Sequence, residues 1–120
     1  MTNDEKVVVY EKTTCNTCKS LVLLLREKGI AFEEIDYMIA PISRDKLVQL
    51  MGKMGMSARQ LMRTNEPEYK ELGLDRPGVS DDDFLAALVA HPGLVQRPIV
   101  EIGDRAILAR PPERVNEILP

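Results

Sequence analysis

Aromatic residues are scarce in this sequence. Tryptophan is absent, and two Phe and three Tyr are the only aromatic side chains among the 120 residues. Hydrophobic residues still reach 44% and charged residues 29%, the balance of an ordinary globular protein. The core must therefore be built from Leu, Val, Ile and Met. The length fits one domain over residues 1–120.

Long apolar stretches and an excess of basic residues are also missing. No run approaches the roughly 18 apolar residues that cross a bilayer, and residues 1–6 are polar, without the apolar centre of a signal peptide. We therefore expect a cytoplasmic protein with no membrane partner. The formal net charge of −3 argues against general nucleic-acid binding, although it allows a local basic pocket for one anion.

Cysteine and histidine are rare as well, with two Cys and one His. A closed structural zinc site needs four ligands, so we expect no metal site. His91 precedes Pro92 at a predicted helix end, which favours a capping or solvent-exposed role. The two cysteines form the motif Cys15-Asn16-Thr17-Cys18. In a chain without an export signal, this spacing indicates redox chemistry rather than a structural disulfide.

The first third of the chain predicts a strand, a helix and a second strand. The run at 7–10 is short, apolar and rich in Val, as in a strand buried on both faces. Apolar residues at helical spacing from Cys18 to Leu25 predict a helix that ends near Gly29. Residues 31–37 alternate loosely and predict another strand. Such a unit fits a right-handed βαβ crossover with two parallel strands.

The rest of the chain predicts a helical middle and a final hairpin. Ser43, Ser57 and Ser80 have the pattern of helix N-caps, and residues 65–72 predict a further helix. Strands are predicted at 97–102 and 106–108 around the turn Gly103-Asp104, followed by a closing helix at Pro111-Pro112. The order βαβ, a helical insert at about 41–92, then ββα predicts an α/β protein. We expect a thioredoxin-like (glutaredoxin-like) fold with a mixed four-stranded sheet.

Cys15 follows a predicted strand and begins a predicted helix. Free N–H groups and the helix dipole at that position favour the thiolate over the thiol. We therefore interpret Cys15 as the nucleophile. Cys18 lies one helical turn further on, within reach of a disulfide or mixed intermediate with Cys15. It also falls on the apolar face of the helix, so a packing role for Cys18 remains open.

Three arginines are candidates for an anion pocket. Arg63 lies in a predicted helical turn, Arg97 directly before Pro98 and Arg110 directly before Pro111. Each alone is typical of a solvated surface charge, except Arg97. In thioredoxin-like folds the residue before the third strand is commonly a cis proline that faces the cysteine. Pro98 is the candidate, and Arg97 would then reach the active-site edge, where its paired donors suit an anion better than lysine does.

At these residues the chain resembles the glutaredoxin-dependent arsenate reductase family and its relatives, the Spx-type transcription regulators. The resemblance spans nearly the whole chain, is most specific in its last block, and implies a thioredoxin-like core with a helical insert. The matching blocks are 10–15, Pro41-Ile42-Ser43-Arg44-Asp45, Arg59-Gln60-Leu61-Met62-Arg63-Thr64-Asn65, Tyr69-Lys70-Glu71-Leu72-Gly73-Leu74 and His91-Pro92-Gly93-Leu94-Val95-Gln96-Arg97-Pro98-Ile99-Val100.

The resemblance implies that Cys15 attacks arsenate while Arg63, Arg97 and Arg110 bind the oxyanion. Glutathione, helped by glutaredoxin, would reduce the cysteine–arsenic adduct and release arsenite. The implied enzyme is an arsenate reductase that binds no cofactor and uses glutathione as co-substrate. We expect it to be a monomer.

The chain departs from the reductases at two positions, Cys18 and Lys19, where serine and arginine are common. Cys-x-x-Cys is typical of the Spx-type regulators, in which it is a disulfide switch and the protein binds RNA polymerase. Cys18 could also resolve the Cys15 intermediate, which makes thioredoxin an alternative partner to glutaredoxin. The alternatives to an arsenate reductase are a redox-switched regulator and a related thiol oxidoreductase with another substrate. The three arginines favour the reductase.

Overall fold

The computed structural model describes residues 6–119. These residues form two compact units, one made of residues up to 40 together with those from 97 onward, and the other made of residues 41–96. The first unit is therefore discontinuous in sequence. The expectation of a single domain with a helical insert at about 41–92 stays a prediction.

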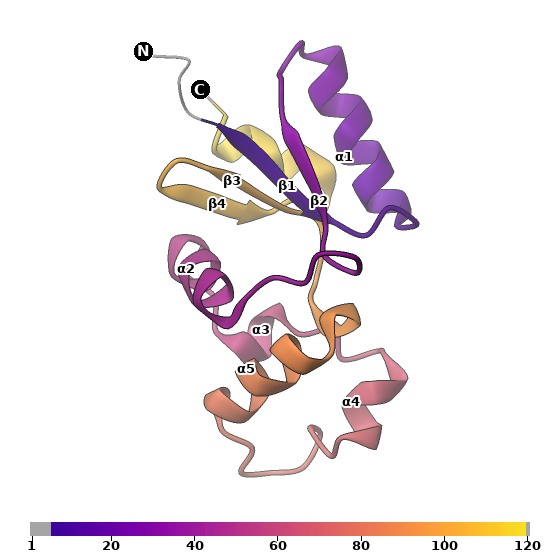
Figure 1. The fold of residues 1–120 in the computed structure, drawn as a ribbon, viewed down its shortest axis with the longest axis vertical. Helices are drawn as coiled ribbons and strands as arrows, with labels where there is room; N and C mark the ends of the chain where they lie inside the picture. Colours follow the sequence, from indigo (N-terminus) through magenta and orange to yellow (C-terminus); the bar gives the residue numbers. More distant parts are fainter. Residues whose placement is uncertain (1–5, 120) are drawn as a thin grey trace. The chain divides into compact units, whose positions relative to one another are not determined.

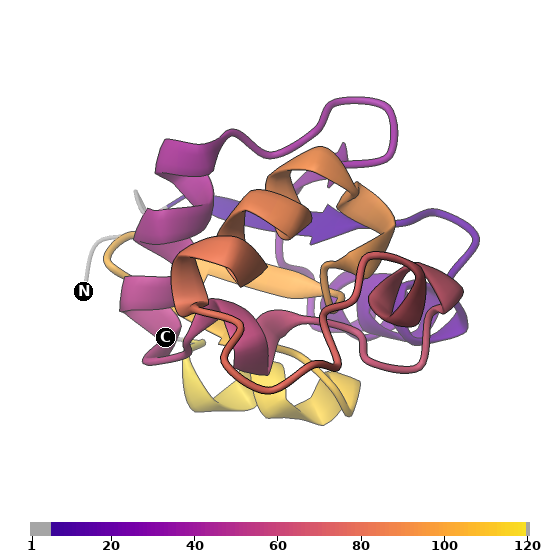
Figure 2. The same ribbon diagram turned by 90° about the horizontal axis from the view of Figure 1, so that it is seen from below.

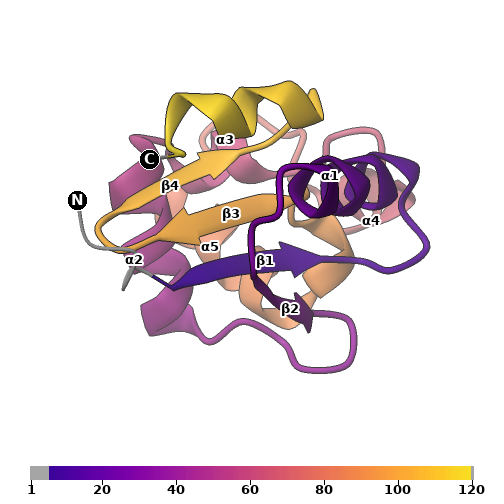
Figure 3. The ribbon, with the colours of Figure 1, turned by 90° about the horizontal axis from the view of Figure 1, so that it is seen from above.

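The first unit is built on a four-stranded sheet with the order β2-β1-β3-β4 (Figure 3). Strand β1 (Val7–Glu11) runs parallel to β2 (Glu33–Asp36) and antiparallel to β3 (Ile99–Ile102), which pairs antiparallel with β4 (Arg105–Leu108). Gly103 in the hairpin turn has φ of 59°, a conformation that favours glycine. The predicted α/β class with a mixed four-stranded sheet is confirmed.

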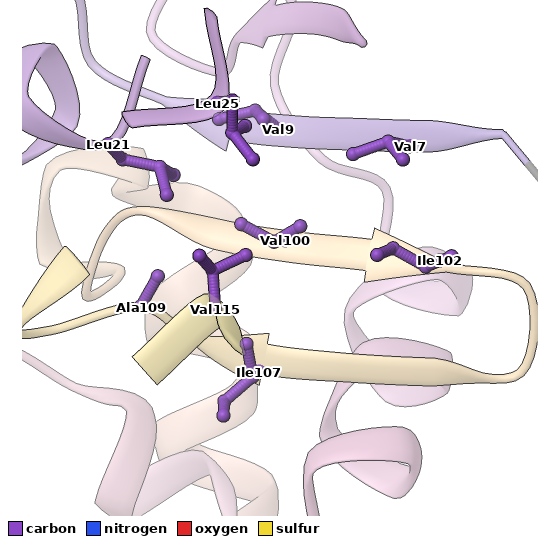
Figure 4. Close-up of a cluster of buried hydrophobic side chains, with 9 residues drawn as sticks. All are labelled: Val7, Val9, Leu21, Leu25, Val100, Ile102, Ile107, Ala109 and Val115. Carbon is purple, nitrogen blue, oxygen red and sulfur yellow. The ribbon is translucent and has the colours of Figure 1, made fainter. Parts of the chain in front are cut away.

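Two helical segments cover one face of this sheet. Helix α1 (Asn16–Glu27) and the 3-10 helix η2 (Pro112–Glu117) lie on the same side of the strands (Figure 3) and contact each other. Between them and the sheet lies an aliphatic cluster (Figure 4), as the scarcity of aromatic residues predicts. Its buried members are Val7, Val9, Leu21, Leu25, Val100, Ile102, Ile107, Ala109 and Val115.

Three segments of the first unit differ from the expectation. Strand β3 begins at Ile99 rather than at residue 97, because its pairing with β1 and β4 starts at Ile99. The second strand is only Glu33–Asp36 rather than 31–37, because as an edge strand it pairs only with Val8–Glu11 of β1. The closing helix is η2, whose hydrogen bonds form the tighter 3-10 turns that are common in short segments.

The second unit is helical (Figures 1 and 2). It contains α2 (Arg44–Met54), α3 (Ala58–Leu61), α4 (Pro67–Glu71), α5 (Asp81–Ala90) and the 3-10 helix η1 (Pro92–Leu94). Helix α5, orange in Figure 2, packs against α2, α3 and η1. Ser43, Ser57 and Ser80 each accept a hydrogen bond from the first turn of α2, α3 and α5. The three helix starts predicted from these serines are confirmed.

Arg63 is not in a helical turn, which corrects the expectation. Helix α3 ends at Leu61, and the chain then extends so that Met62 forms a β-bridge with Val95. The Arg63 N–H donates to the Leu94 carbonyl at 2.7 Å. This pairing satisfies the hydrogen-bonding groups of the backbone without a helix.

The helix predicted at 65–72 is also shorter than expected, because α4 begins with Pro67 in its first turn. Within residues 6–119 no helix has the length and apolar character to span a membrane.

Candidate active site

Cys15 is the N-cap residue of α1, directly after the loop that leaves β1. Its own N–H donates to the Lys12 carbonyl at 2.9 Å, which holds the loop in a turn. Burial would raise the pKa of the half-buried thiol. Hydrogen bonds to its sulfur from the Cys18 and Thr17 N–H groups, the Cys18 thiol and the Arg97 guanidinium instead lower the pKa to about 7. Cys15 is therefore substantially ionised at neutral pH.

Cys18 has the opposite character. Its side chain is completely buried, and burial raises the pKa of the thiol to about 12. The Lys12 N–H donates to the Cys18 sulfur and opposes that rise, whereas the charges of Cys15 and Glu11 add to it. The pair therefore consists of one thiolate and one thiol that keeps its proton and donates it in a hydrogen bond to Cys15.

Arg97 lies directly before β3, joined to Pro98 by a cis peptide bond. Its side chain is 6% exposed, and one guanidinium nitrogen (Nη1) donates to the Tyr37 hydroxyl at 3.4 Å. Burial opposes the charge, but hydrogen bonds to Tyr37 and to Cys15 raise the pKa of Arg97 above its usual value. A buried positive charge therefore lies beside the Cys15 sulfur.

Arg110 reaches the same part of the first unit. Its Nη1 donates to the Arg97 carbonyl oxygen at 3.1 Å. This bond crosses between the segments before β3 and after β4, because the two strands run antiparallel. The structure thus brings Cys15, Cys18, Arg97 and Arg110 together in one unit, from three separate stretches of sequence.

Arg63 belongs to the other unit. Its Nε donates to Glu66 at 3.0 Å, and its side chain is 16% exposed. Its role as a third oxyanion ligand stays a prediction. His91 is the C-cap residue of α5, at the helix end where the sequence predicts it, and its N–H donates to the Ala87 carbonyl.

Two residues near the cysteines were missed by the sequence analysis. Tyr37 is fully buried and contacts Arg97; the sequence indicated only that it ends the predicted strand at 31–37. Glu11 ends β1 and is 3% exposed. Burial, a hydrogen bond with Glu34 and the nearby charges of Glu34, Asp36 and Cys15 raise the pKa of Glu11 to about 7. The only signal in the sequence was a carboxyl at the end of a strand buried on both faces.

This arrangement suits attack by sulfur on an anionic or disulfide substrate. It offers an ionised thiol, a buried guanidinium that opposes like-charge repulsion, and a second thiol within bonding reach. Within residues 6–119 no three or more His, Cys, Asp or Glu side chains are grouped as a metal site.

Known proteins resemble the chain over nearly its whole length. Residues 10–118 match the ArsC family. The arsenate reductase of Neisseria meningitidis serogroup A is 36% identical over 115 residues, which cover 95% of this chain and 98% of that protein. The arsenate reductase of Escherichia coli K12 is 38% identical over 114 residues, covering 95% of this chain and 81% of that one.

The solved structure of an arsenate reductase from Vibrio cholerae has a TM-score of 0.92 and 39% identity to this chain. The match covers 98% of this chain and 100% of that structure. These matches confirm the resemblance drawn from the sequence and the thioredoxin-like fold that it implied. The chain belongs to the ArsC family.

Proposed function

We propose that this protein reduces arsenate to arsenite and that Cys15 is the residue that attacks arsenic. The observation that carries the proposal is the Cys15 thiolate, with its pKa of about 7, hydrogen-bonded by the buried Arg97. Arsenate is an anion at neutral pH, so an attacking thiolate meets like-charge repulsion. Fixed positive donors reduce that repulsion most as charge builds up in the transition state. The relatives named arsenate reductase support the same substrate.

The reaction begins when the Cys15 thiolate forms a sulfur–arsenic(V) bond and one oxygen of arsenate leaves as water after protonation. Glutathione then attacks the adduct. The two sulfurs become joined as a mixed disulfide on Cys15, their two electrons reduce arsenic(V) to arsenic(III), and arsenite leaves. Glutaredoxin or thioredoxin restores the Cys15 thiolate. Glutathione is a co-substrate in this scheme.

Arg97, Arg110 and Arg63 bind the oxyanion in this proposal. Arg97 contacts the attacking sulfur, and Arg110 is held against the Arg97 backbone, which supports a shared role for these two residues. Arg63 is included on the family resemblance. Arginine suits the position because its planar group offers paired donors to one anion.

Arsenate-dependent NADPH oxidation in the presence of glutathione, glutaredoxin and glutathione reductase tests the proposal. A charge-assisted hydrogen bond contributes about 1.5–3 kcal/mol. We therefore expect Arg63→Lys, Arg97→Lys and Arg110→Lys each to slow turnover by roughly 10- to 150-fold. Arg114→Lys is the matched control, because Arg114 is an exposed residue that pairs with Glu117.

Three outcomes of this assay would contradict or refine the proposal. Lysine variants of Arg63 and Arg97 with wild-type rates would show that the oxyanion pocket is wrong. No arsenate turnover with either glutaredoxin or thioredoxin would show that the activity is wrong. A faster rate with thioredoxin would identify the reductant.

A further inference from the structure

We propose that Glu11 accepts the proton of Cys18 when Cys18 attacks a disulfide held on Cys15. The inference rests on the proposed function, since it assumes that Cys15 forms a mixed disulfide. It deepens that function by giving the buried second cysteine a resolving role and a partner for its proton.

Cys18 needs such a partner because its thiol is not the reactive form. Only a thiolate attacks a disulfide at a useful rate. Burial raises the pKa of the Cys18 thiol far above neutral pH, so nearly all of it is protonated there. Its side chain is completely buried, so bulk water cannot take the proton directly.

Glu11 is placed to take it. Glu11 is followed by Lys12, whose N–H donates to the Cys18 sulfur, so that sulfur lies against the end of β1. The charge of Glu11 acts on Cys18 as well as on Cys15. Among residues 6–119 no group forms a hydrogen bond with the buried Oε2 atom of Glu11. A buried carboxylate oxygen without a hydrogen-bond partner raises the free energy of the ionised form, so the protonated form of Glu11 is favoured.

The groups around Glu11 favour its protonated form. Glu34 shares a hydrogen bond with Glu11 but is exposed, and one of its oxygens lies 3.6 Å from an Arg26 nitrogen. Glu11 is almost fully buried and forms no ion pair of this kind with any group of residues 6–119, so burial disfavours its charged form. The charged and titratable groups around Glu11 are Glu34 and Asp36 from β2, Cys15 and Cys18 from the start of α1, and Lys19 and Arg26 from the same helix.

A cavity gives the proton a route to solvent. Glu11, Glu34, Lys19 and Arg26 line a space of about 390 Å³ beside α1. That volume holds several water molecules. Burial and the neighbouring acids raise the pKa of Glu11 to about 7, so it can both accept and release a proton near neutral pH.

In the proposed step, the Cys18 proton moves to the Glu11 carboxylate while the Cys18 sulfur attacks the Cys15 sulfur. The Cys15–Cys18 bond forms, the bond from Cys15 to the attached thiol breaks, and that thiol leaves as a thiolate with the electron pair. When an external dithiol later reduces the Cys15–Cys18 disulfide, Cys18 leaves and takes the proton back from Glu11.

The test uses the reduced full chain and one equivalent of dithiobis-nitrobenzoate, an aromatic disulfide that releases a coloured thiolate. The first colour phase reports attack by Cys15, and the second reports attack by Cys18 on the resulting mixed disulfide. In the wild type, the second-phase rate should rise with pH and level off as Glu11 becomes ionised. The midpoint should lie at or below the pKa of about 7 that Glu11 has beside a charged Cys15. Glu11→Gln should slow this phase on the order of 100-fold at neutral pH, the typical effect of a lost general base.

Three further variants test whether the second phase depends on Cys18 and on the Glu11 carboxylate. Cys18→Ser should lose the second phase and keep the first. Glu34→Gln, the matched control, should keep the second phase and move its midpoint to lower pH, because the Glu34 charge raises the pKa of Glu11. Glu11→Asp should recover part of the rate, which a purely structural role would not predict.

A Glu11→Gln protein with the wild-type second-phase rate and pH profile would overturn the inference. So would a wild type without a second phase, although the chemistry at Cys15 would stand. A missing first phase would instead contradict Cys15 as the nucleophile and with it the proposed function. If Glu11→Gln does not fold, an unchanged midpoint in Glu34→Gln would count against Glu11.

Discussion

Cys15 and Cys18 lie three positions apart, yet their sulfurs have different surroundings. Cys15 receives hydrogen bonds from two N–H groups of the first turn and from Arg97, whereas Cys18 faces the core. Iodoacetamide should therefore alkylate Cys15 with a midpoint near pH 7 and leave Cys18 unlabelled, as read by mass spectrometry. In denaturant both should react with an ordinary midpoint of about 8.5. Labelling of Cys18 first at low pH would contradict the assignment.

The sequence was sufficient to locate Cys15 between a strand and a helix, because that position is a local property. The role of Cys15 as the nucleophile stays a prediction. The sequence was not sufficient for Glu11 or Tyr37. Burial of a side chain depends on segments that are remote in sequence. The same is true of Tyr10, whose hydroxyl donates to Glu101 at 2.9 Å across two paired strands. Burial and that carboxylate raise the pKa of Tyr10 above its usual value.

Helix starts were predicted more accurately than helix ends. A serine N-cap acts within one turn, so Ser43, Ser57 and Ser80 were sufficient to locate α2, α3 and α5. The end of α3 depends instead on the remote bridge between Met62 and Val95, which the sequence does not reveal. For the same reason the predicted helical turn at Arg63 is wrong.

The capping box of α5 allows the contribution of one helix start to stability to be measured. The Ser80 hydroxyl accepts from the Asp83 N–H, and the Asp83 carboxylate accepts from the Ser80 N–H. Ser80→Ala should lower the free energy of unfolding by about 1 kcal/mol, measured by urea denaturation. Ser20→Ala, at an exposed position within α1, is the control and should change it by less than about 0.5 kcal/mol. Equal losses in the two variants would show that the cap contributes nothing.

The stability of the whole molecule should depend on pH through Glu11. Its pKa is about 7 in the folded protein against 4.5 as the reference value, so the folded chain holds this proton more tightly than the unfolded chain. The contribution of Glu11 to the free energy of unfolding is therefore fully present below about pH 4.5 and is lost as the pH rises through 7. Glu11→Gln should be more stable than the wild type at pH 8, by on the order of 2 kcal/mol.

Urea unfolding at pH 5 and pH 8 measures that difference. The advantage of Glu11→Gln should shrink strongly at pH 5, where the wild-type carboxyl is protonated. Glu34→Gln removes one of the charges that raise the pKa of Glu11, so it should also gain stability at pH 8, by less than Glu11→Gln. An equal difference between Glu11→Gln and the wild type at both pH values would contradict a raised pKa.

The discontinuity of the first unit has a consequence for synthesis on the ribosome. The strand β1 and helix α1 emerge early, whereas β3, β4 and η2 are made last, and Val9 pairs with Val100. The cluster around Leu21 and Leu25 cannot close until Val115 has been added. Arg97, which helps to keep Cys15 ionised, is also made late. A nascent chain therefore carries both thiols before the Arg97 guanidinium can donate its hydrogen bond to Cys15, and only the finished chain has every group that lowers the pKa of Cys15.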